Sequence, residues 1–270
     1  MLYYFICRYH MEFSKAKLIF FSPGRKTLDV ASTFLKHLGY DFEKVNLTSY
    51  KKRDINITVE KDELIIFAYP VYGGRVPQIM VNHIRNIVFK NNIVIALAVY
   101  GNRAYEDALI EMKHLVESYG CKLAGAGAFI ANHSIMRKVA VNRPNEKDKV
   151  IIKDFAYNIK NKLDNLENIE MLEDLHVAGN FPYRKYNGIP LKPTGNSKCN
   201  SCGACVNNCP TNAIPKENPR KTIKSKCITC MGCHVICPQN ARHLNTLLHE
   251  LSEIPFKIIF GKPKDIEVFY

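Results

Sequence analysis

The sequence predicts an α/β protein in which an open, doubly wound parallel sheet of five strands precedes a small cysteine-rich domain. Apolar runs of strand length alternate with segments of helical spacing over residues 15–176, a pattern typical of parallel sheets with helices on both faces. The apolar runs are nearly continuous, as expected for strands buried on both faces. Eight of the ten cysteines fall within residues 199–237, which sets this part apart as a second domain.

Each element can be placed from its periodicity and its end signals. Strands are expected at 17–22, 41–47, 63–69, 92–99 and 123–130. Helices are expected at 27–39, 77–87, 104–119 and 145–175, and Gly39 and Gly120 end the first and third. In the last helix an apolar stripe at three- and four-residue steps should pack on the sheet: Val150, Ile152, Phe155, Ile159, Leu163 and Leu166.

Three loops follow strands of this sheet and should meet at one edge, where doubly wound sheets bind their ligands. The first loop is residues 22–27, the second is residues 70–77 (PVYGGRVP), and the third is residues 100–107 (YGNRAYED). The first is rich in hydroxyl and amide groups at a helix N-terminus, which suits a phosphate. The other two carry glycines, which let backbone approach a flat ring, and tyrosines, which can stack on it.

The cysteine-rich part contains one motif twice, with the copies 28 residues apart. Each copy reads C-x2-C-x2-C-x3-C-P, and the cysteines are Cys199, Cys202, Cys205, Cys209, Cys227, Cys230, Cys233 and Cys237. This spacing is typical of two [4Fe–4S] clusters in which the fourth cysteine of each run ligates the other cluster. One cluster would then take Cys199, Cys202, Cys205 and Cys237, and the second would take Cys227, Cys230, Cys233 and Cys209.

Two other interpretations of these cysteines fit less well. Zinc ribbons need four ligands and do not repeat this run with its following proline. A disulfide framework needs an oxidising compartment, for which nothing in the sequence argues. Of the remaining cysteines, Cys121 is expected to be a small buried apolar residue at the start of a strand, far in sequence from Cys7.

Over about 190–245, the paired cysteine runs with Ala213 and Ala241 resemble the bacterial two-cluster ferredoxin. The three loops resemble the FMN site of the flavodoxin family, and the combination resembles the flavodoxin–ferredoxin fusion proteins over about 15–245. The resemblance implies a flavodoxin-like sheet, a small α+β ferredoxin domain and a bound FMN. The FMN phosphate would lie on Ser22, Pro23, Gly24, Arg25, Lys26 and Thr27. The ring would lie between two groups of residues: Pro70, Val71, Tyr72, Gly73 and Gly74 on one side, and Tyr100, Gly101, Asn102 and Tyr105 on the other.

The first loop departs from the family pattern, which is Ser-x-Thr-Gly-x-Thr. Here Gly24 stands at the Thr position and Arg25 at the Gly position, and Lys26 follows. One hydroxyl donor is lost and an arginine occupies a place that needs glycine's backbone freedom. Two cations are gained, and these could hold a phosphate dianion instead.

These boundaries divide the chain into five segments. Residues 1–14 are an N-terminal extension, 15–176 the flavodoxin-like domain, 177–189 a linker that lies against one or both domains, 190–245 the two-cluster domain, and 246–270 an apolar tail expected to cover the cluster domain. The first ten residues lack a basic region and a cleavage site, so we expect no signal peptide. No apolar run approaches the roughly 18 residues of a membrane span.

The formal net charge is +13. Nucleic acid would be the first interpretation of such a charge, but two clusters and an FMN phosphate would lower it to about +7. The excess lies in the cluster domain, where it could steer an acidic redox partner or simply form a solvated face. We therefore expect a redox protein partner and neither nucleic acid nor a membrane. The pattern of cysteine use suits a reducing cytoplasm.

The expected function is electron transfer between two [4Fe–4S] clusters and FMN, and an electron carrier is favoured over a substrate-specific enzyme. No side chain is assigned a catalytic acid–base role. An alternative is a ferredoxin whose flavodoxin-like half has lost FMN and serves as a docking scaffold, which the change at Gly24 and Arg25 motivates. A third hypothesis is a flavin reductase with its own organic substrate, which requires an open pocket above the ring.

Overall fold

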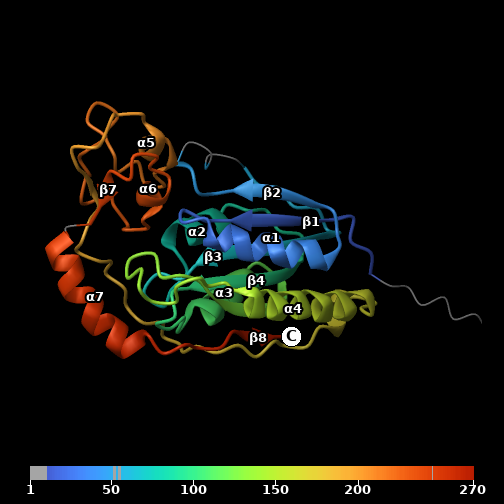
Figure 1. Cartoon of the computed structure of the whole chain (residues 1–270). Coiled ribbons are helices and arrows are strands. Elements are labelled where there is room, and N and C mark those ends of the chain that lie inside the picture. The colour runs from blue at the N-terminus through green and yellow to red at the C-terminus, as the bar shows by residue number, and fades with distance from the viewer. Residues whose placement is uncertain (1–10, 51–52, 54–55, 245) are drawn as a thin grey trace, which may run out of the picture.

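The computed structural model describes residues 11–50, 53, 56–244 and 246–270. The rest of the predicted N-terminal extension, residues 1–10 with Cys7, lies outside the described residues. A six-stranded sheet with helices on both faces forms the larger domain, and the cysteine-rich domain sits beyond one end of its strands (Figure 1). The chain passes from the large domain to the small one and then returns, so that its C-terminus lies beside the sheet (Figure 1).

The sheet has the strand order β2-β1-β3-β4-β5-β8. Its first five strands are parallel neighbours: β1 (Lys15–Phe20), β2 (Phe42–Asn46), β3 (Glu63–Pro70), β4 (Ile93–Tyr100) and β5 (Lys122–Ile130). The order 2-1-3-4-5 is that of the flavodoxin-like doubly wound fold. The predicted fold class is therefore confirmed. The sixth strand, β8 (Glu267–Phe269), was not expected from the sequence and pairs antiparallel with β5.

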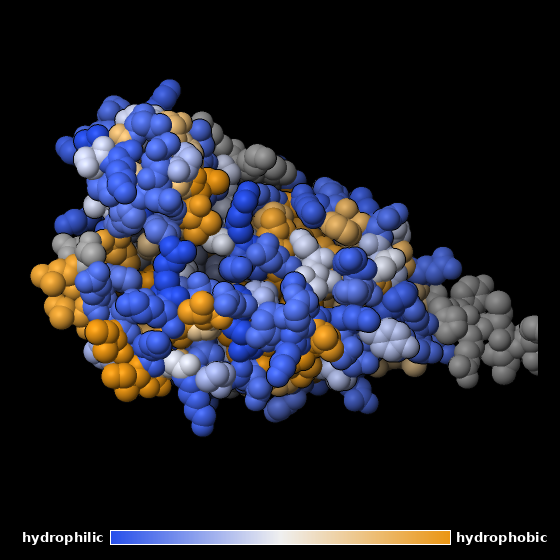
Figure 2. Space-filling model, viewed as in Figure 1, coloured by the Kyte–Doolittle hydropathy of each residue, from blue (hydrophilic) through white to orange (hydrophobic). Residues whose placement is uncertain are grey.

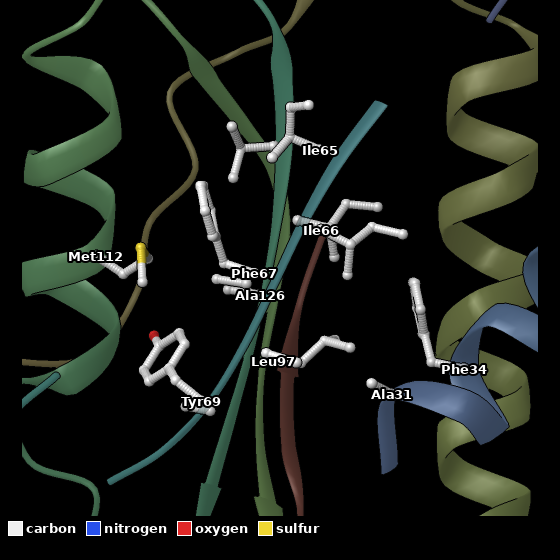
Figure 3. Close-up of a cluster of buried hydrophobic side chains, with 14 of the residues drawn as sticks. Ala31, Phe34, Ile65, Ile66, Phe67, Tyr69, Leu97, Met112 and Ala126 are labelled. Carbon is white, nitrogen blue, oxygen red and sulfur yellow. The ribbon is translucent and has the colours of Figure 1, made fainter. Parts of the chain in front are cut away.

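Two helix layers cover the sheet. Helices α1 (Lys26–Leu38) and α4 (Glu146–Asp164) pack together, and the rings of Phe34 and Phe155 lie 5.3 Å apart. Helix α3 (Ala108–Glu117) covers the opposite face: Figure 3 shows Met112 on one side of the strands and Phe34 on the other. A further helix, α2 (Gln78–Ile84), follows β3. The buried strands are apolar on both faces because both faces meet helices.

Local signals in the sequence fix the ends of several helices. Gly39 follows α1 with a φ of 81°, a left-handed conformation that suits glycine. Asn145 and Asp148 form a reciprocal capping box at the start of α4, where each side chain accepts the other's backbone N–H. The stripe on α4 is buried as predicted except for Val150, which is 57% exposed because it lies on the solvent side of the helix.

The cysteine-rich domain is built from two short helices and a two-stranded ladder. These are α5 (Ala204–Asn208), α6 (Gly232–Val235), β6 (Thr194–Gly195) and β7 (Arg242–His243). The domain packs against the carboxyl edge of the sheet: a Cβ added to Gly232 would lie 3.0 Å from the Pro23 carbonyl. Gly232 thus allows the two domains to approach closely at the first loop.

The segment between the domains follows the short 3-10 helix η2 (Ile169–Met171) and has no helix or strand over residues 172–193. It lies along the large domain, where both oxygens of Asp107 accept backbone N–H bonds, from Asn180 at 2.9 Å and from Arg184 at 2.7 Å. The guanidinium of Arg75 stacks on Tyr183 at 4.9 Å. The predicted linker therefore crosses the loops that follow β3 and β4.

The C-terminal tail contains α7 (Thr246–Phe260) and β8. The expectation that it covers the cluster domain is wrong. Helix α7 instead runs from that domain back to the large one (Figure 1), and β8 hydrogen-bonds to the edge strand β5. The reason is that β5 would otherwise leave an open row of backbone donors and acceptors, which the tail satisfies. Within the described part of the chain, no helix is both long and apolar enough to cross a membrane.

Candidate functional site

A cavity of about 210 Å³ lies between the carboxyl edge of the sheet and the cysteine-rich domain; we call it the edge cavity. On the sheet side its lining comes from all three loops: Pro23, Gly24, Lys26, Thr27, Pro70, Val71, Tyr72, Tyr100 and Gly101. On the other side it is lined by Cys230, His234 and Val235. A second cavity of about 310 Å³ shares Val71, Tyr72, Gly101, His133 and Ser134 with it and also includes Gly73.

The first loop places a helix N-terminus at the edge cavity. The Ser22 hydroxyl accepts the N–H of Leu28 at 3.0 Å, while the Thr48 hydroxyl accepts the N–H of Ser22 at 2.9 Å. These bonds hold the loop at the start of α1, where the first-turn amides have no partner within the helix. Gly24, Lys26 and Thr27 line the cavity, whereas Ser22 and Arg25 do not. The arrangement presents amides, a hydroxyl and an ammonium to a small anion.

Arg25 has the left-handed backbone that its position in the loop requires. Its φ is 67° and its ψ is −29°, and it is exposed. A residue with a Cβ pays a steric cost in this region that glycine avoids. The loop thus places a residue with a side chain where glycine is favoured.

Arg25→Gly is expected to stabilise the protein by about 0.5 to 1 kcal/mol, because relief of the left-handed strain outweighs the extra freedom of the unfolded chain. The measurement is the midpoint of urea unfolding under anaerobic conditions. Arg25→Ala is the control, since it removes the charge but keeps the Cβ, and it should give no gain. Equal gains in both variants would assign the effect to the lost charge.

The second loop makes a tight hairpin turn. The N–H of Tyr72 bonds the Arg75 carbonyl at 3.1 Å and the reverse bond is 3.2 Å, while Gly73 and Gly74 have φ values of 59° and 83°. This turn needs positive φ at both central residues, which glycine supplies. Glu111 of α3 holds the loop, because its carboxylate accepts two 2.7 Å bonds from Arg75. Burial raises the pKa of Tyr72 well above its ordinary value, so its phenol stays protonated.

The two glycines of this turn are covered by side chains of the same chain. A Cβ at Gly73 would lie 2.0 Å from the Tyr186 ring, and one at Gly74 would lie 1.9 Å from the Glu106 carboxylate. Gly73 lines the second cavity, whereas Gly74 lines neither. The linker residue Tyr186 therefore occupies space directly over the second loop.

Some residues of the third loop line the edge cavity, and others bond the C-terminal tail. Gly101 faces the edge cavity. A Cβ added to Gly101 would lie 2.9 Å from the Cα of His133, so His133 packs directly against this glycine. Asn102 turns away: its amide donates to the carbonyls of Phe260 at 2.7 Å and Lys262 at 2.9 Å. Tyr105 also lies outside both cavities, and its hydroxyl donates to Glu267 at 2.7 Å. The structure thus brings Tyr100 and Gly101 to the cavity and directs the other two residues to the tail.

His133 is a cavity residue that the sequence analysis did not single out. Its Nδ1 accepts the N–H groups of Ile135 at 3.1 Å and Met136 at 2.9 Å, so the proton of the neutral ring is on Nε2. Burial, and then the charge of Arg103, lower the pKa of His133 to about 4. The signal that could have found it is its position just after the last predicted parallel strand, since the carboxyl ends of parallel strands share one edge.

We expect His133 to make the protein less stable as the pH falls below its unfolded-state pKa of about 6.5. Between about pH 4 and pH 6.5 the unfolded chain binds a proton that the folded chain excludes. The free energy of unfolding therefore rises with pH through this window and reaches its full value above about pH 6.5. The wild type should lose about 1 to 2 kcal/mol between pH 7 and pH 5 from this group. His133→Asn, which keeps a hydrogen-bond acceptor, should lack that loss in denaturant titrations at each pH. Parallel profiles for the two proteins would contradict the assignment.

None of the described cysteines forms a disulfide, and the eight cysteines of the two runs line two small cavities. The first cysteine cavity brings together Cys199, Cys202, Cys205 and Cys237. The second brings together Cys209, Cys227, Cys230 and Cys233. In each copy of the repeat, an alanine N–H donates to the fourth thiol at 3.2 Å: Ala213 to Cys209 and Ala241 to Cys237. Cys121 is buried at the start of β5, as predicted.

Arg242 is the second residue that the sequence analysis missed as part of a site. It is 1% exposed and lines both cysteine cavities. The repeat contains a signal that could have found it, because Arg242 follows Ala241 where Ile214 follows Ala213 in the other copy. A charged residue that replaces an apolar one in a buried repeat indicates a specific ionic or hydrogen-bonding partner, because an unpaired buried charge is costly.

Comparison with known proteins gives a family for the small domain. Residues 198–242 match the family described as a 4Fe-4S dicluster domain. No curated protein sequence matches the chain.

Among solved structures, similar ones include a flavodoxin from the domain Archaea (14% identity, TM-score 0.40), covering 55% of this chain and 98% of its own. A Fusobacterium nucleatum flavodoxin bound to flavin mononucleotide has 14% identity and a TM-score of 0.37 over the same shares. The apo form of an NADH:FMN oxidoreductase has 13% identity and a TM-score of 0.42, covering 59% of this chain and 94% of its own.

The class of protein follows from the strand order and the domain match. The chain combines a flavodoxin-like domain with a ferredoxin-type 4Fe–4S dicluster domain.

Proposed function

We propose that this protein transfers electrons between two [4Fe–4S] clusters in its small domain and an FMN held at the edge cavity. The observation that carries the proposal is the position of Cys230, which lines both the second cysteine cavity and the edge cavity. A cysteine ligand that borders both sites gives electrons a short path between them. Each cluster would supply a one-electron transfer, and a bound FMN would hold one or two electrons.

For the clusters, the proposed ligands are Cys199, Cys202, Cys205 and Cys237 for one and Cys209, Cys227, Cys230 and Cys233 for the other. The residues fit these groups, because each small cavity is lined by the first three cysteines of one copy of the repeat and the fourth cysteine of the other. The backbone N–H bonds to Cys209 and Cys237 also suit thiolates, which accept them better than thiols do.

For FMN, the proposed phosphate site is the start of α1 with Gly24, Lys26 and Thr27. Its amides, hydroxyl and cation match a dianion. The ring would lie toward Tyr72 and Gly101, where the two adjoining cavities together reach the size range of ligand pockets. Asn102 and Tyr105 are not needed for this arrangement, since both are bonded to the tail.

The experiment is anaerobic purification followed by iron, sulfide and flavin analysis of one sample. The proposal expects about eight irons and about one FMN per chain. Flavin absorbance should then bleach when a one-electron donor reduces the clusters. Eight irons without flavin, after reconstitution with excess FMN, would contradict the flavin half and leave the cluster half standing.

One observation favours the scaffold alternative, in which the flavodoxin-like half binds no FMN. Tyr186 covers Gly73 and His133 covers Gly101, so side chains of this chain fill space beside the ring loops. Under this alternative Tyr186→Ala should create flavin binding that the wild type lacks. Under the electron-transfer proposal the wild type binds FMN already, and Tyr186→Ala changes its affinity without creating it. Equilibrium dialysis of both proteins against FMN separates the two cases.

The partner that suits the cluster domain is an acidic redox protein. Exposed cations are concentrated there: Lys198, Lys216, Arg220, Lys221, Lys224 and Lys226. Such a surface speeds encounter with an acidic partner mainly at low ionic strength.

A further inference from the structure

The side chain of Arg242 lies between the two cysteine cavities and lines both of them. At 1% exposure it is the largest fully buried side chain of the described residues. Among the residues that the structure describes, no carboxylate forms an ion pair with it, and it donates to carbonyls and a hydroxyl. A buried guanidinium without a counter-ion is costly unless an anion is present when the protein is complete.

The two terminal nitrogens of the guanidinium, which carry four of its five N–H donors, both bond oxygens of the surrounding chain. Nη1 donates to the Pro219 carbonyl at 2.6 Å and Nη2 to the Pro193 carbonyl at 2.8 Å, while the Thr222 hydroxyl also contacts Nη2. These bonds fix the guanidinium plane. The fifth donor, Nε–H, is buried and has no hydrogen-bond partner. An orphaned buried donor next to thiol-lined cavities points to an acceptor that belongs to the cluster sites.

The other copy of the motif has no cation at the position that corresponds to Arg242. The equivalent position in the other copy is Ile214, which is 3% exposed and lines only the second cysteine cavity. Arg242 thus breaks the symmetry of the two halves and puts one charge where both cavities meet.

We propose that Arg242 raises the reduction potentials of both [4Fe–4S] clusters, as a shared cation whose Nε–H donates to a cluster sulfur. This rests on the cluster half of the proposed function and not on the flavin half. Each reduction adds one electron, and therefore one negative charge, to a cluster next to the guanidinium. A fixed cation and a hydrogen bond to sulfur both favour the more negative state. Because the charge is shared, both clusters are affected by one side chain.

The test is a redox titration followed by EPR spectroscopy on anaerobic wild type, Arg242→Gln and Arg242→Lys, with iron and sulfide measured on each sample. Arg242→Gln should shift both midpoint potentials to more negative values. Arg242→Lys, which keeps the charge but loses Nε–H, should give a smaller shift of the same sign. Lys216→Gln is the matched control, since it removes an exposed cation of the same domain and should move the potentials least.

Full iron content with unchanged potentials in Arg242→Gln, or a shift confined to one cluster, would overturn the proposal. A purely structural role would lower the iron content while the remaining clusters keep wild-type potentials. If both variants lose iron, pulsed EPR with ¹⁵N-labelled arginine decides the matter. It is run on reduced protein in which Arg220→Lys and Arg137→Lys remove the other guanidinium groups beside the cysteines. Coupling of guanidinium nitrogen to both clusters supports the proposal, and its absence refutes it. Iron-free wild type would instead refute the cluster half of the proposed function.

A second inference comes from α7, which turns its apolar residues outward. Leu247, Leu251, Ile254, Ile258 and Ile259 are 62–79% exposed and share one face of the helix. Figure 2 shows hydrophobic residues along the edge of the molecule that α7 occupies in Figure 1. The opposite face is anchored to the large domain: Glu253 pairs with Lys138 at 3.1 Å, and His249 Nε2 lies 2.7 Å from the Ile135 carbonyl. These polar contacts hold the apolar face in solvent.

Charge indicates what this face contacts. Exposed Lys257 and Lys262 lie on or just after the helix, Glu250 is its one exposed carboxylate, and the chain as a whole is strongly cationic. Two copies of such a chain repel each other, and the stripe lacks the flanking charge pairs that specify helix pairing. An apolar helix face with a cationic surrounding suits an anionic lipid surface, on which the helix lies without spanning it.

We infer that α7 docks this protein on anionic membranes. The sequence-based expectation of no membrane rested on the lack of a spanning segment, which a surface-lying helix does not need. The test is co-sedimentation with phosphatidylglycerol–phosphatidylcholine vesicles and with pure phosphatidylcholine vesicles. Wild type should bind the anionic vesicles several-fold better than the neutral ones. Leu251→Glu with Ile258→Glu should abolish binding, and Val150→Glu with Tyr157→Glu, at exposed positions of α4, should not.

Failure of wild type to bind anionic vesicles would refute the inference. So would equal binding of the two glutamate pairs. Light scattering without lipid is the complementary measurement: a dimer that becomes a monomer only in Leu251→Glu with Ile258→Glu would assign the face to a second copy instead.

Discussion

Cys230→Ala is expected to lose about half of the roughly eight bound irons and to stop reduction of the flavin by the clusters. Cys230 lines the second cysteine cavity and is the only one of the eight paired-run cysteines that also lines the edge cavity. Under the proposed function its loss would remove a ligand of one cluster and the one cysteine that borders both cavities. Iron and sulfide analysis, EPR of the reduced protein and stopped-flow flavin absorbance measure these effects.

Two further variants make the result specific. Cys202→Ala removes a ligand from the first cysteine cavity, so it should lose a similar amount of iron yet retain flavin reduction through the intact second cluster. Cys121→Ala changes a buried cysteine outside the motif and should keep all the iron. A Cys230→Ala protein that still holds eight irons would contradict the ligand assignment. Equal loss of flavin reduction in the first two variants would contradict the proposed path.

Glu111→Ala is expected to destabilise the protein by about 3 kcal/mol and to weaken FMN binding. Glu111 is 8% exposed, and its carboxylate accepts two bonds from Arg75 and the N–H of Val76 at 2.9 Å. Removing it leaves the Arg75 guanidinium and a buried amide without their main partner. The hairpin that carries Tyr72 then loses its attachment to α3, and Tyr72 borders the edge cavity.

The measurements are urea unfolding under anaerobic conditions and FMN equilibrium dialysis. Glu117→Gln lies on the same helix and is more exposed, with only a 3.8 Å ion pair to Lys113, so it should change stability by less than about 1 kcal/mol. Similar losses in the two variants would show that Glu111 acts through helix charge rather than through the second loop.

Much of the architecture could be predicted because its signals are local. The apolar runs around Ile66 and Leu97 are long enough for buried strands, and strand–helix alternation restricts them to a parallel sheet. Gly39 ends α1 and Asn145 begins α4 through contacts within a few residues. The same holds for the cysteine runs, where the ligand spacing is itself a chemical requirement. The three loops were placed correctly at one edge because parallel strands share their carboxyl ends.

What could not be predicted depends on contacts between distant segments. Asn102 and Tyr105 fit the pattern of a flavin loop, but the tail competes for both through Phe260 and Glu267, more than 150 residues away. Tyr186 covers Gly73 only because the linker crosses the second loop.

The sequence by itself therefore determined the doubly wound sheet, the cluster motif and the edge at which the three loops meet, since periodicity and spacing encode these within short stretches. The tertiary structure alone decided that β8 closes the sheet beside β5, that Cys230 faces the edge cavity, and that Arg242 lies between the two sets of cysteines. Each of these results from packing whole segments against one another, so no local pattern carries it.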